Sequence, residues 1–535
     1  MASNNEFLNN YSDSNECTSR GVCSISPAIS ALEDLLLLFL EHAAYYILNL
    51  EALGAKNEKI KYKIINTLSS LISVNEFTEK ELYNIVNNGY YLLENTKSTY
   101  LKLCRELNKQ TKQLKLPIAF SHSLALSKAI AVGIKYSTMK NKSRSLEQKN
   151  FISVLLILLK SVTLNLSKLV DFNEFDDVAY HEILTTLNLF NSEKIRVEEL
   201  KSKISKLSET DYNLHLKISD LLIKTFGEIS EVNVSHSTRP GKAILVSGNN
   251  FFDLLNVLEK TKNENIDVYT HSNLLIVHAL SNFKKYPNLR GHYGNQTENC
   301  ILDFATFPGS ILLTKNLRAN REFFYRGRLF STDYIVPSGI IKIENDDFSA
   351  LIKSAKTAKG FSKGKLKPDT LLGYDEIKTS EELNNIVDKL NNGKIKKLYI
   401  VGINAHLTTQ KIYFDEFFNN LNDDEFVISF SYSSAKKNVL VLNVGDYVPL
   451  VTGLLHKFFD KCNVSDDKIV FFFTTCDVMT ISSIILLKNL GAKNIYMTQC
   501  LPTIISPNVF ESFKKTYEIF NTTTPVNDLS NIRAL

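Results

Sequence analysis

The sequence predicts a multidomain protein in which an all-helical N-terminal part precedes two α/β domains with mainly parallel, Rossmann-like sheets. Two observations lead to this fold class. Residues 1–227 show apolar side chains at three-to-four spacing with few strand signals, which is typical of antiparallel helix bundles. From residue 228 onward, short β-branched runs alternate with helical segments, and this pattern restarts near residue 371. We therefore expect three domains, covering residues 1–227, 228–370 and 371–535.

The helices expected in the first domain are separated by short polar breaks, such as the one at residues 171–174. These helices cover Leu32–Leu53, Lys59–Leu71, Glu79–Leu107, Leu124–Tyr136, Leu146–Val170 and Ser192–Phe226. Two of these regions contain long apolar stretches, but each is interrupted by charged side chains, so we do not expect them to cross a membrane.

In the second domain, buried-strand patterns occur at Ala243–Val246, Ile266–Thr270 and Ser310–Thr314. A helix is expected at Phe252–Thr261, and an apolar helical segment followed by a Gly/Asn-rich loop is expected between the last two strands. In the third domain the expected strands are Leu398–Gly402, Val427–Ser431, Val439–Val444, Ile469–Phe473 and Ile495–Met497. Helices at Tyr413–Leu421, Val448–Lys461 and Val478–Leu490 alternate with them. Sites in such sheets lie at the carboxyl ends of the strands, and four polar residues follow strand ends: Asn249, Asn404, Asp446 and Asp477.

The composition, with 44% hydrophobic and 22% charged residues, is that of a soluble globular protein. A net charge of +5 is small for 535 residues and does not favour a nucleic-acid partner. Seven scattered cysteines form no disulfide framework, and the first fifteen residues fit no signal peptide, so we expect a cytoplasmic location. The segment Lys353–Lys367 contains six lysines, which indicates an exposed loop or a docking patch for an acidic electron carrier.

The usual catalytic signatures are missing: there is no P-loop, nucleophile elbow, H-E-x-x-H or Rossmann glycine triplet. Cys476 is the best candidate for a reactive thiol, because it stands beside Asp477 at a strand end. His271 and His278 are seven residues apart, which is compatible with a metal site. Structural hydrogen bonds are the favoured interpretation, since His271 lies at the turn after a strand.

The most informative stretch, Ile266 to Leu317, contains THSNL, KKYP, HYG, FPG and TKNL in this order. It resembles the central segment of the hybrid-cluster proteins (the prismane or hydroxylamine reductase family), which has THGEM, KKYP, G-x-YG, FPG and TTNC. The fold of that family is related to that of the carbon monoxide dehydrogenases. The resemblance implies a helical domain followed by two α/β domains.

That family holds an iron–sulfur–oxygen hybrid cluster with one His, two Glu and four Cys, and a second cluster (4Fe–4S or 2Fe–2S) with four N-terminal cysteines. The resemblance assigns the seven hybrid-cluster positions to Asn249, Asn273, Leu317, Asn404, Ser434, Tyr447 and Asp477. Thiolates are the soft ligands that iron and sulfide need, and all four are replaced. Cys17 and Cys23 are what remains of the N-terminal set. No metal-binding or catalytic residue is assigned with assurance.

The resemblance combined with these replacements predicts no bound cofactor and a cluster-free pseudoenzyme with a scaffold or binding role. Its partner would be an unknown protein or a small polar ligand, with no nucleic acid and no membrane. This hypothesis predicts that Tyr447 and Leu317 are buried near Asn249 and Asn404.

Two alternatives stay open. One is an iron–sulfur oxidoreductase that reduces hydroxylamine or nitric oxide, as the family does, with an altered metal site that includes Asp477 and His271. The other is a small-ligand pocket lined by Asn249, Asn273, Asn404 and Asp477.

Overall fold

The computed structural model describes residues 25–534, apart from 56, 193, 295–299, 316–324, 326, 404–408, 433, 435, 476 and 499–506. The chain divides into two compact units. The first contains Met1–Leu214, Cys476–Leu486 and Leu501–Tyr517, and the second contains His215–Thr475, Leu487–Cys500 and Glu518–Leu535. The predicted domain boundaries at residues 227 and 370 stay a prediction.

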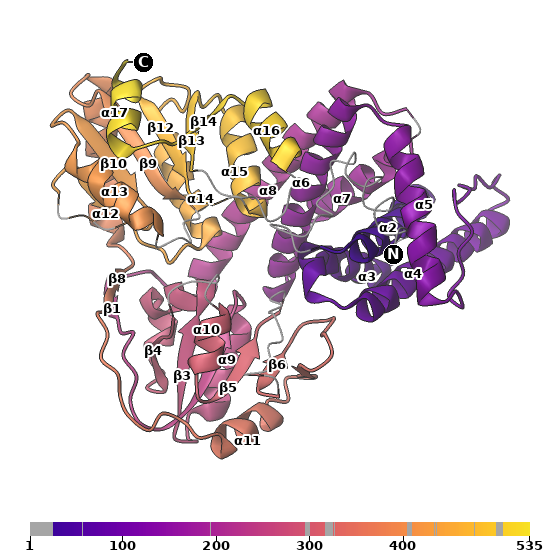
Figure 1. Ribbon diagram of the computed structural model, residues 1–535, viewed down its shortest axis with the longest axis horizontal. Coiled ribbons are helices and arrows are strands. Elements are labelled where there is room, and N and C mark those ends of the chain that lie inside the picture. Colours follow the sequence, from indigo (N-terminus) through magenta and orange to yellow (C-terminus); the bar gives the residue numbers. More distant parts are fainter. Residues whose placement is uncertain are drawn as a thin grey trace, which may run out of the picture. The chain divides into compact units, whose positions relative to one another are not determined.

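The first unit is helical (Figure 1). Its helices are α2 (Pro27–Ala52), α3 (Glu58–Ser69), α4 (Glu79–Glu106), α5 (Leu126–Lys142), α6 (Leu146–Asp171), α7 (Asp177–Leu189) and α16 (Pro507–Thr516), with the 3-10 helix η1 (Ser70–Glu76). Helices α8 (Val197–Phe226) and α15 (Val478–Asn489) contribute residues to both units. The expected helices are thus present, and α7 is an addition that the sequence pattern did not indicate.

Helix α2 is the core helix of this unit. Residues Leu35–Leu40 are buried without a break, and α2 packs against α4, α5 and α7. A helix that is apolar on all sides is stable only when neighbouring helices cover it. The start of α2 is fixed locally, because the Ser26 side chain accepts a hydrogen bond from Ile29 N and Pro27 occupies the first turn.

Helix α6 is the one described helix that is long and apolar enough to cross a membrane. Its most apolar window is 78% buried inside the fold, as in the core helix of a globular domain. The capping box formed by Ser145 and Gln148 marks where it begins.

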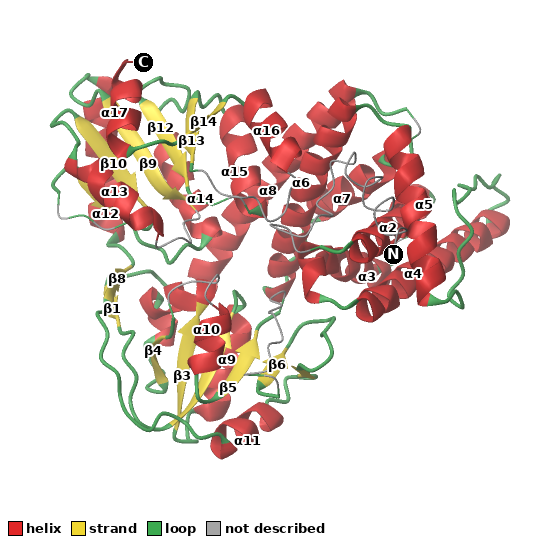
Figure 2. Ribbon diagram, in the orientation of Figure 1, coloured by secondary structure: helices red, strands yellow, loops and turns green. Residues whose placement is uncertain are grey.

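The second unit contains two six-stranded sheets in which all the strands are parallel (Figure 2). The first sheet has the order β4-β3-β2-β5-β6-β7, with β2 (Lys242–Ser247), β3 (Ile266–His271), β4 (Leu289–His292), β5 (Ser310–Leu313), β6 (Leu329–Ser331) and β7 (Ile341–Lys342). The second has the order β11-β10-β9-β12-β13-β14, with β9 (Lys397–Ile403), β10 (Glu425–Ser429), β11 (Val439–Val441), β12 (Ile469–Phe473), β13 (Asn494–Met497) and β14 (Ile519–Asn521).

Helices alternate with these strands, as the parallel pairing requires. They are α9 (Phe251–Thr261), α10 (Cys300–Thr306), α11 (Ser349–Thr357), α12 (Glu376–Asn391), α13 (Thr409–Asn419), α14 (Val448–Phe459) and α17 (Pro525–Ala534). The mixed helical and α/β fold predicted from the sequence is confirmed. A two-stranded antiparallel pair, β1 (Val232–Val234) with β8 (Thr370–Leu372), joins the segment that enters the first sheet region to the segment that leaves it.

Two local expectations are corrected. Residues after β3 were expected to form an ordinary apolar helix, but Ser272–Ala279 and Ser281–Phe283 are 3-10 helices (η2 and η3). Ser272 has a positive φ of 59°, so the backbone turns directly after the strand. The segment Lys353–Lys367 was expected to be a loop, but its first residues belong to α11, with Leu351 and Ala355 buried on one face.

Candidate functional site

Three neighbouring strands of the first sheet end in polar residues that lie side by side. Ser247, His271 and His292 are the last residues of β2, β3 and β4. Ser247 pairs in register with His271, and Thr270 pairs with His292. All of these side chains are buried, with Ser247 1% and His271 0% exposed. Polar groups at the carboxyl edge of a parallel sheet occupy the position where α/β proteins place their sites.

A hydrogen-bonded chain leads from this edge toward solvent. Ser247 Oγ lies 2.8 Å from His271 Nδ1, and His271 Nε2 lies 3.3 Å from Asp303 Oδ2. Asp303 comes from α10, and its side chain is 19% exposed. Gly294 allows this approach, because a Cβ at that position would stand within 2.1 Å of Asp303 Oδ2. The two imidazole nitrogens therefore connect a solvent-accessible carboxylate to a buried hydroxyl.

Thr270 organises the other histidines. Its hydroxyl lies 2.9 Å from His278 Nε2 and 2.9 Å from His292 Nδ1. A hydroxyl has one proton to donate, so at least one of these two imidazoles must donate to it. His236 meets His292 edge to face, with ring centroids 5.6 Å apart, and its Nε2 lies 2.9 Å from the Thr370 hydroxyl.

Within this histidine cluster (His236, His271, His278 and His292), the electrostatics of three rings favour the neutral form. Burial lowers the pKa of His278 to about 4. Burial, and then the three neighbouring imidazoles, hold the pKa of His292 well below its ordinary value. Burial and the nearby Lys367 ammonium lower the pKa of His236. At neutral pH these three rings are therefore uncharged hydrogen-bonding groups.

The structure describes five of the seven positions that the resemblance singled out. Asn249 lies in the turn after β2, where its backbone N–H donates to Thr314 Oγ1 at 3.1 Å, and Asn273 lies in η2. Ser434 Oγ accepts from Lys436 N at 3.2 Å, and Asp477 Oδ1 accepts from Thr480 N at 2.8 Å at the start of α15. Leu317 and Asn404, with Cys17 and Cys23, lie outside the described residues.

Tyr447 is the bulkiest of these replacements. It is 2% exposed, and its ring meets the Phe251 ring edge to face at 5.2 Å. Phe251 follows Asn249 by two residues at the start of α9, so the structure brings Tyr447 close to the turn that carries Asn249. The assignment of these positions to lost cluster ligands stays a prediction.

The described residues do not fit an iron–sulfur cluster. They contain no group of three or more His, Cys, Asp or Glu side chains placed to hold a metal ion. The described cysteines, Cys104, Cys300 and Cys462, form no disulfide, and burial, followed by Asp466, raises the pKa of the Cys462 thiol to about 12. The other four cysteines, including Cys476, lie outside the described part of the chain.

Sequence reasoning missed how this site is assembled. It singled out His271 and His278 and favoured structural hydrogen bonds, and both rings do have a hydrogen-bond partner. It did not find Ser247 or Asp303. Ser247 could have been found, because it directly follows a predicted strand, whereas nothing in the sequence links Asp303 to His271.

Comparisons with known proteins give one consistent result. The sequence profile described as "Prismane/CO dehydrogenase family" matches residues 12–445. The relatives named "Hydroxylamine reductase" include one from Thermosipho melanesiensis, 27% identical over 542 residues and covering 96% of this chain and 97% of the relative. Another, from Petrotoga mobilis, is 26% identical, and the match covers 94% of this chain and 96% of the relative. A third, from Maridesulfovibrio salexigens, is 24% identical, and the match covers 96% of this chain and 97% of the relative.

Among solved structures, the chain is similar to the alpha subunits of acetyl-CoA synthase/carbon monoxide dehydrogenase, which are described with nickel-containing Fe4S4 clusters. The TM-score is 0.47 at 11% identity, covering 97% of this chain and 84% of that chain. The expectation that no cofactor is bound is contradicted by the family match and the hydroxylamine reductase relatives, because this is a family of iron–sulfur proteins.

Proposed function

This chain belongs to the Prismane/CO dehydrogenase family, and from that premise we propose that it is an iron–sulfur oxidoreductase that reduces hydroxylamine or nitric oxide at an altered metal site. The end-to-end matches to proteins named hydroxylamine reductase support the reaction class. We also propose a cytoplasmic location, which is where cysteines stay reduced.

The proposal rests on the hydrogen-bonded series Asp303–His271–Ser247 at the carboxyl edge of the first sheet. Reduction of hydroxylamine to ammonia and water consumes two electrons and two protons, as does reduction of two nitric oxide molecules to nitrous oxide and water. A buried reducing site must therefore be supplied with protons. The partly exposed Asp303 carboxylate takes a proton from water and passes it to His271 Nε2. His271 Nδ1 then releases a proton toward Ser247 Oγ, which is 2.8 Å away.

The described residues hold no cluster ligand set, so no step of the reaction is assigned to a cluster here. What this chain's own residues contribute is proton supply and exclusion of water. The Ser247 and His271 side chains are almost completely buried, which keeps bulk solvent away from the strand ends.

Electrons must come from a donor, and the lysine-rich segment 353–367 offers a surface for an acidic carrier. Five of its six lysines are exposed, and Lys356 also forms an ion pair with Glu264. Electrostatic docking of this kind weakens as ionic strength rises, so the rate with a protein donor should fall with added salt.

The test uses the full chain purified without oxygen. Iron and acid-labile sulfide are measured first, and then ammonia formed from hydroxylamine with reduced methyl viologen as electron donor. We expect one ammonia for two electrons. The variants Asp303→Asn and His271→Asn should reduce turnover by about 100-fold, since general acid–base groups contribute about 10²–10⁴. The matched control His181→Asn changes an exposed histidine on α7 and should keep full turnover.

Iron content separates the possible results. If Asp303→Asn keeps its iron but loses turnover, and the loss is larger at high pH where protons are scarce, the proton-supply role is supported. If wild-type protein contains iron and sulfide but forms no ammonia or nitrous oxide, the reductase proposal is wrong.

A second candidate, a family member with a binding role and no turnover, is favoured by Tyr447. A bulky, 2% exposed ring packed on Phe251 occupies a position that the resemblance gives to a small metal-binding thiolate. This candidate concerns turnover and not cofactor content. Turnover of the natural chain and of the Tyr447→Cys variant distinguishes the two. No ammonia formation by the natural chain, with a gain in the variant, would support the binding role, and measurable turnover of the natural chain would count against it.

A further inference from the structure

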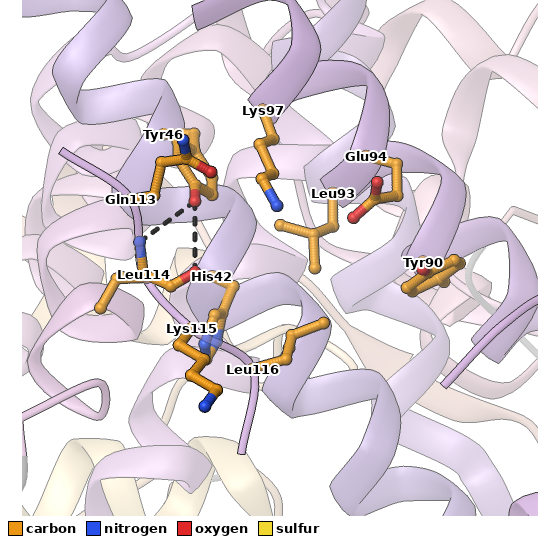
Figure 3. Close-up of a pocket in the computed structure, with 10 residues that line it drawn as sticks. All are labelled: His42, Tyr46, Tyr90, Leu93, Glu94, Lys97, Gln113, Leu114, Lys115 and Leu116. Atoms are coloured by element: carbon orange, nitrogen blue, oxygen red, sulfur yellow. Dashed lines mark hydrogen bonds between the residues drawn. The ribbon is translucent and has the colours of Figure 1, made fainter. Parts of the chain in front are cut away.

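A pocket of about 470 Å³ opens in the first unit, away from the residues discussed above (Figure 3). It lies between α2, α4 and the segment formed by residues 113–116. Its volume is within the range of small-molecule sites, which is roughly 300–1,000 Å³. Nothing in the proposed reductase reaction uses it.

The walls of this pocket are held by specific contacts. His42 and Tyr46 are one helical turn apart on α2, so they face the same side. The Tyr46 hydroxyl accepts a hydrogen bond from Leu114 N at 3.2 Å and donates to Leu114 O at 3.4 Å, as Figure 3 shows. These two bonds fix the segment 113–116 as the third wall.

Helix α4 contributes one anion and one cation. Glu94 and Lys97 are three residues apart on the same face, so their Cβ atoms are about 5–6 Å apart. Figure 3 shows both head groups turned toward the same space, with the buried Leu93 between them. Within the described part of the chain, neither Glu94 nor Lys97 forms an ion pair or a side-chain hydrogen bond. Both charges are therefore available to a ligand.

The segment 113–116 adds a second cation, Lys115, whereas the imidazole of His42 is uncharged. His42 is 5% exposed, and its Nδ1 lies 3.1 Å from Leu38 O. Burial lowers the pKa of His42, and the nearby Lys97 ammonium lowers it further against the opposing effect of two backbone carbonyls. The pocket therefore presents the Glu94 carboxylate and the Lys97 and Lys115 side chains beside apolar and aromatic surface.

We propose that this pocket binds a small zwitterion of the amino-acid class. The ligand's ammonium pairs with Glu94, its carboxylate pairs with Lys97, and an apolar side chain packs against Leu93 and Tyr90. The two charges one turn apart match the short spacing of the two charges in an α-amino acid, and neither a simple anion nor a simple amine would use both. This site is independent of the proposed reductase function.

The test is isothermal titration of the full chain with glycine, L-leucine, L-phenylalanine and L-glutamate. We expect at least one of these to bind with a dissociation constant below about 1 mM, an affinity of about 4 kcal/mol. The N-acetyl derivative of that amino acid lacks the ammonium, and its carboxamide lacks the carboxylate. Each derivative should bind at least 10-fold more weakly.

Variants identify the residues. Lys97→Met and Glu94→Gln should each weaken binding at least 10-fold, whereas the matched control Lys102→Met, which alters an exposed lysine on the same helix, should bind like wild type. Unchanged circular dichroism would show that the variants fold. The proposal is overturned if none of the four amino acids binds at 10 mM (about −2.7 kcal/mol), if the N-acetyl derivative binds as well as its parent, or if Lys97→Met behaves like Lys102→Met.

Discussion

The strongest physical prediction concerns acid and the buried histidine cluster. The folded protein keeps His292 and His278 neutral, with the pKa of His278 lowered to about 4 from an ordinary 6.5. An unfolded chain restores the ordinary value. As pH falls below 6.5, the unfolded chain therefore gains protons that the folded chain does not bind. The free energy of unfolding then decreases with falling pH, and for His278 this decrease ends as pH passes through 4.

The magnitude follows from the pKa shift. Each such imidazole contributes a slope of about 1.4 kcal/mol per pH unit. Over the interval from 6.5 to 4, His278 can contribute at most about 3 kcal/mol, and less because the residue is only partly buried by its solvent-accessible surface. His292, which is 2% exposed, contributes without that reduction. The charged or titratable groups facing the pair are His236, His271 and, through His271, Asp303.

The assay compares wild type with His292→Asn, because the Asn amide can replace Nδ1 in the contact with Thr270. Urea unfolding is followed by circular dichroism at pH 7.5, 6.0 and 4.5, since the chain has no tryptophan. We expect the variant to be less stable at pH 7.5 by about 1–3 kcal/mol. Its stability should fall less steeply, by about 1.4 kcal/mol per pH unit, so the two curves converge in acid.

The exposed His181→Asn variant serves as the control and should run parallel to wild type. Carboxylates also titrate in this range, but they are common to all three proteins and cancel in the comparison. If His292→Asn also runs parallel to wild type from pH 7.5 to 4.5, His292 is not held neutral by burial and the reasoning is wrong.

Three further predictions concern buried charges. Arg328 donates hydrogen bonds to the carbonyls of three residues at 2.6–3.1 Å. Arg328→Met should therefore lower the free energy of unfolding by about 2–4 kcal/mol, as measured by urea titration. A loss under about 0.5 kcal/mol would contradict a structural role for Arg328. Asp211 accepts hydrogen bonds from three buried side chains beside Lys168, whose pKa burial lowers to about 8. Asp211→Asn should therefore cost about 3 kcal/mol at pH 7 and less at pH 9, where Lys168 is neutral, and equal losses at both pH values would refute this coupling. Burial opposes ionisation of Glu425, but hydrogen bonds from Arg533 at 2.6 and 2.8 Å hold the pKa of Glu425 below its ordinary value. Arg533→Ala should therefore lower the free energy of unfolding by about 3–5 kcal/mol at pH 7. The loss should be smaller near pH 4, where Glu425 can be neutralised.

Long periodic segments made most of the fold predictable. The helical pattern around Leu146–Val170 covers almost all of α6, because apolar spacing over many residues determines both the type of element and its buried face. Short elements were missed for the opposite reason. Strands β6 and β7 contain three and two residues, which is too few to show an alternation. They form because each has a neighbouring edge to pair with, β5 for β6 and β6 for β7.

The candidate site was also only partly predictable from the sequence. The seven-residue spacing from His278 drew attention to His271, and the rule that polar residues after parallel strands gather at one edge drew attention to Asn249. The contact between His271 and Asp303 was not predictable, because it depends on how α10 packs over the strand ends, and sequence separation does not encode that geometry. The cofactor expectation failed for a different reason, since it inferred cofactor loss from substitutions at family ligand positions alone, with Asn249 and Tyr447 in one set and the N-terminal cysteines in the other.

The antiparallel pair β1–β8 holds the two ends of a long chain segment side by side, which allows that segment to be excised. Val234 and Thr370 are register partners, so the chain leaves and re-enters the pair at nearly the same point, about 5 Å apart. Further bridges, Thr238 with Lys365 and Gly241 with Phe361, continue the same ribbon. Residues 235–369 therefore form one segment whose first and last residues lie next to each other. A two-residue Asn-Gly turn from Val234 to Thr370 would close the gap as a hairpin, and the excised sheet could be grafted into a foreign loop.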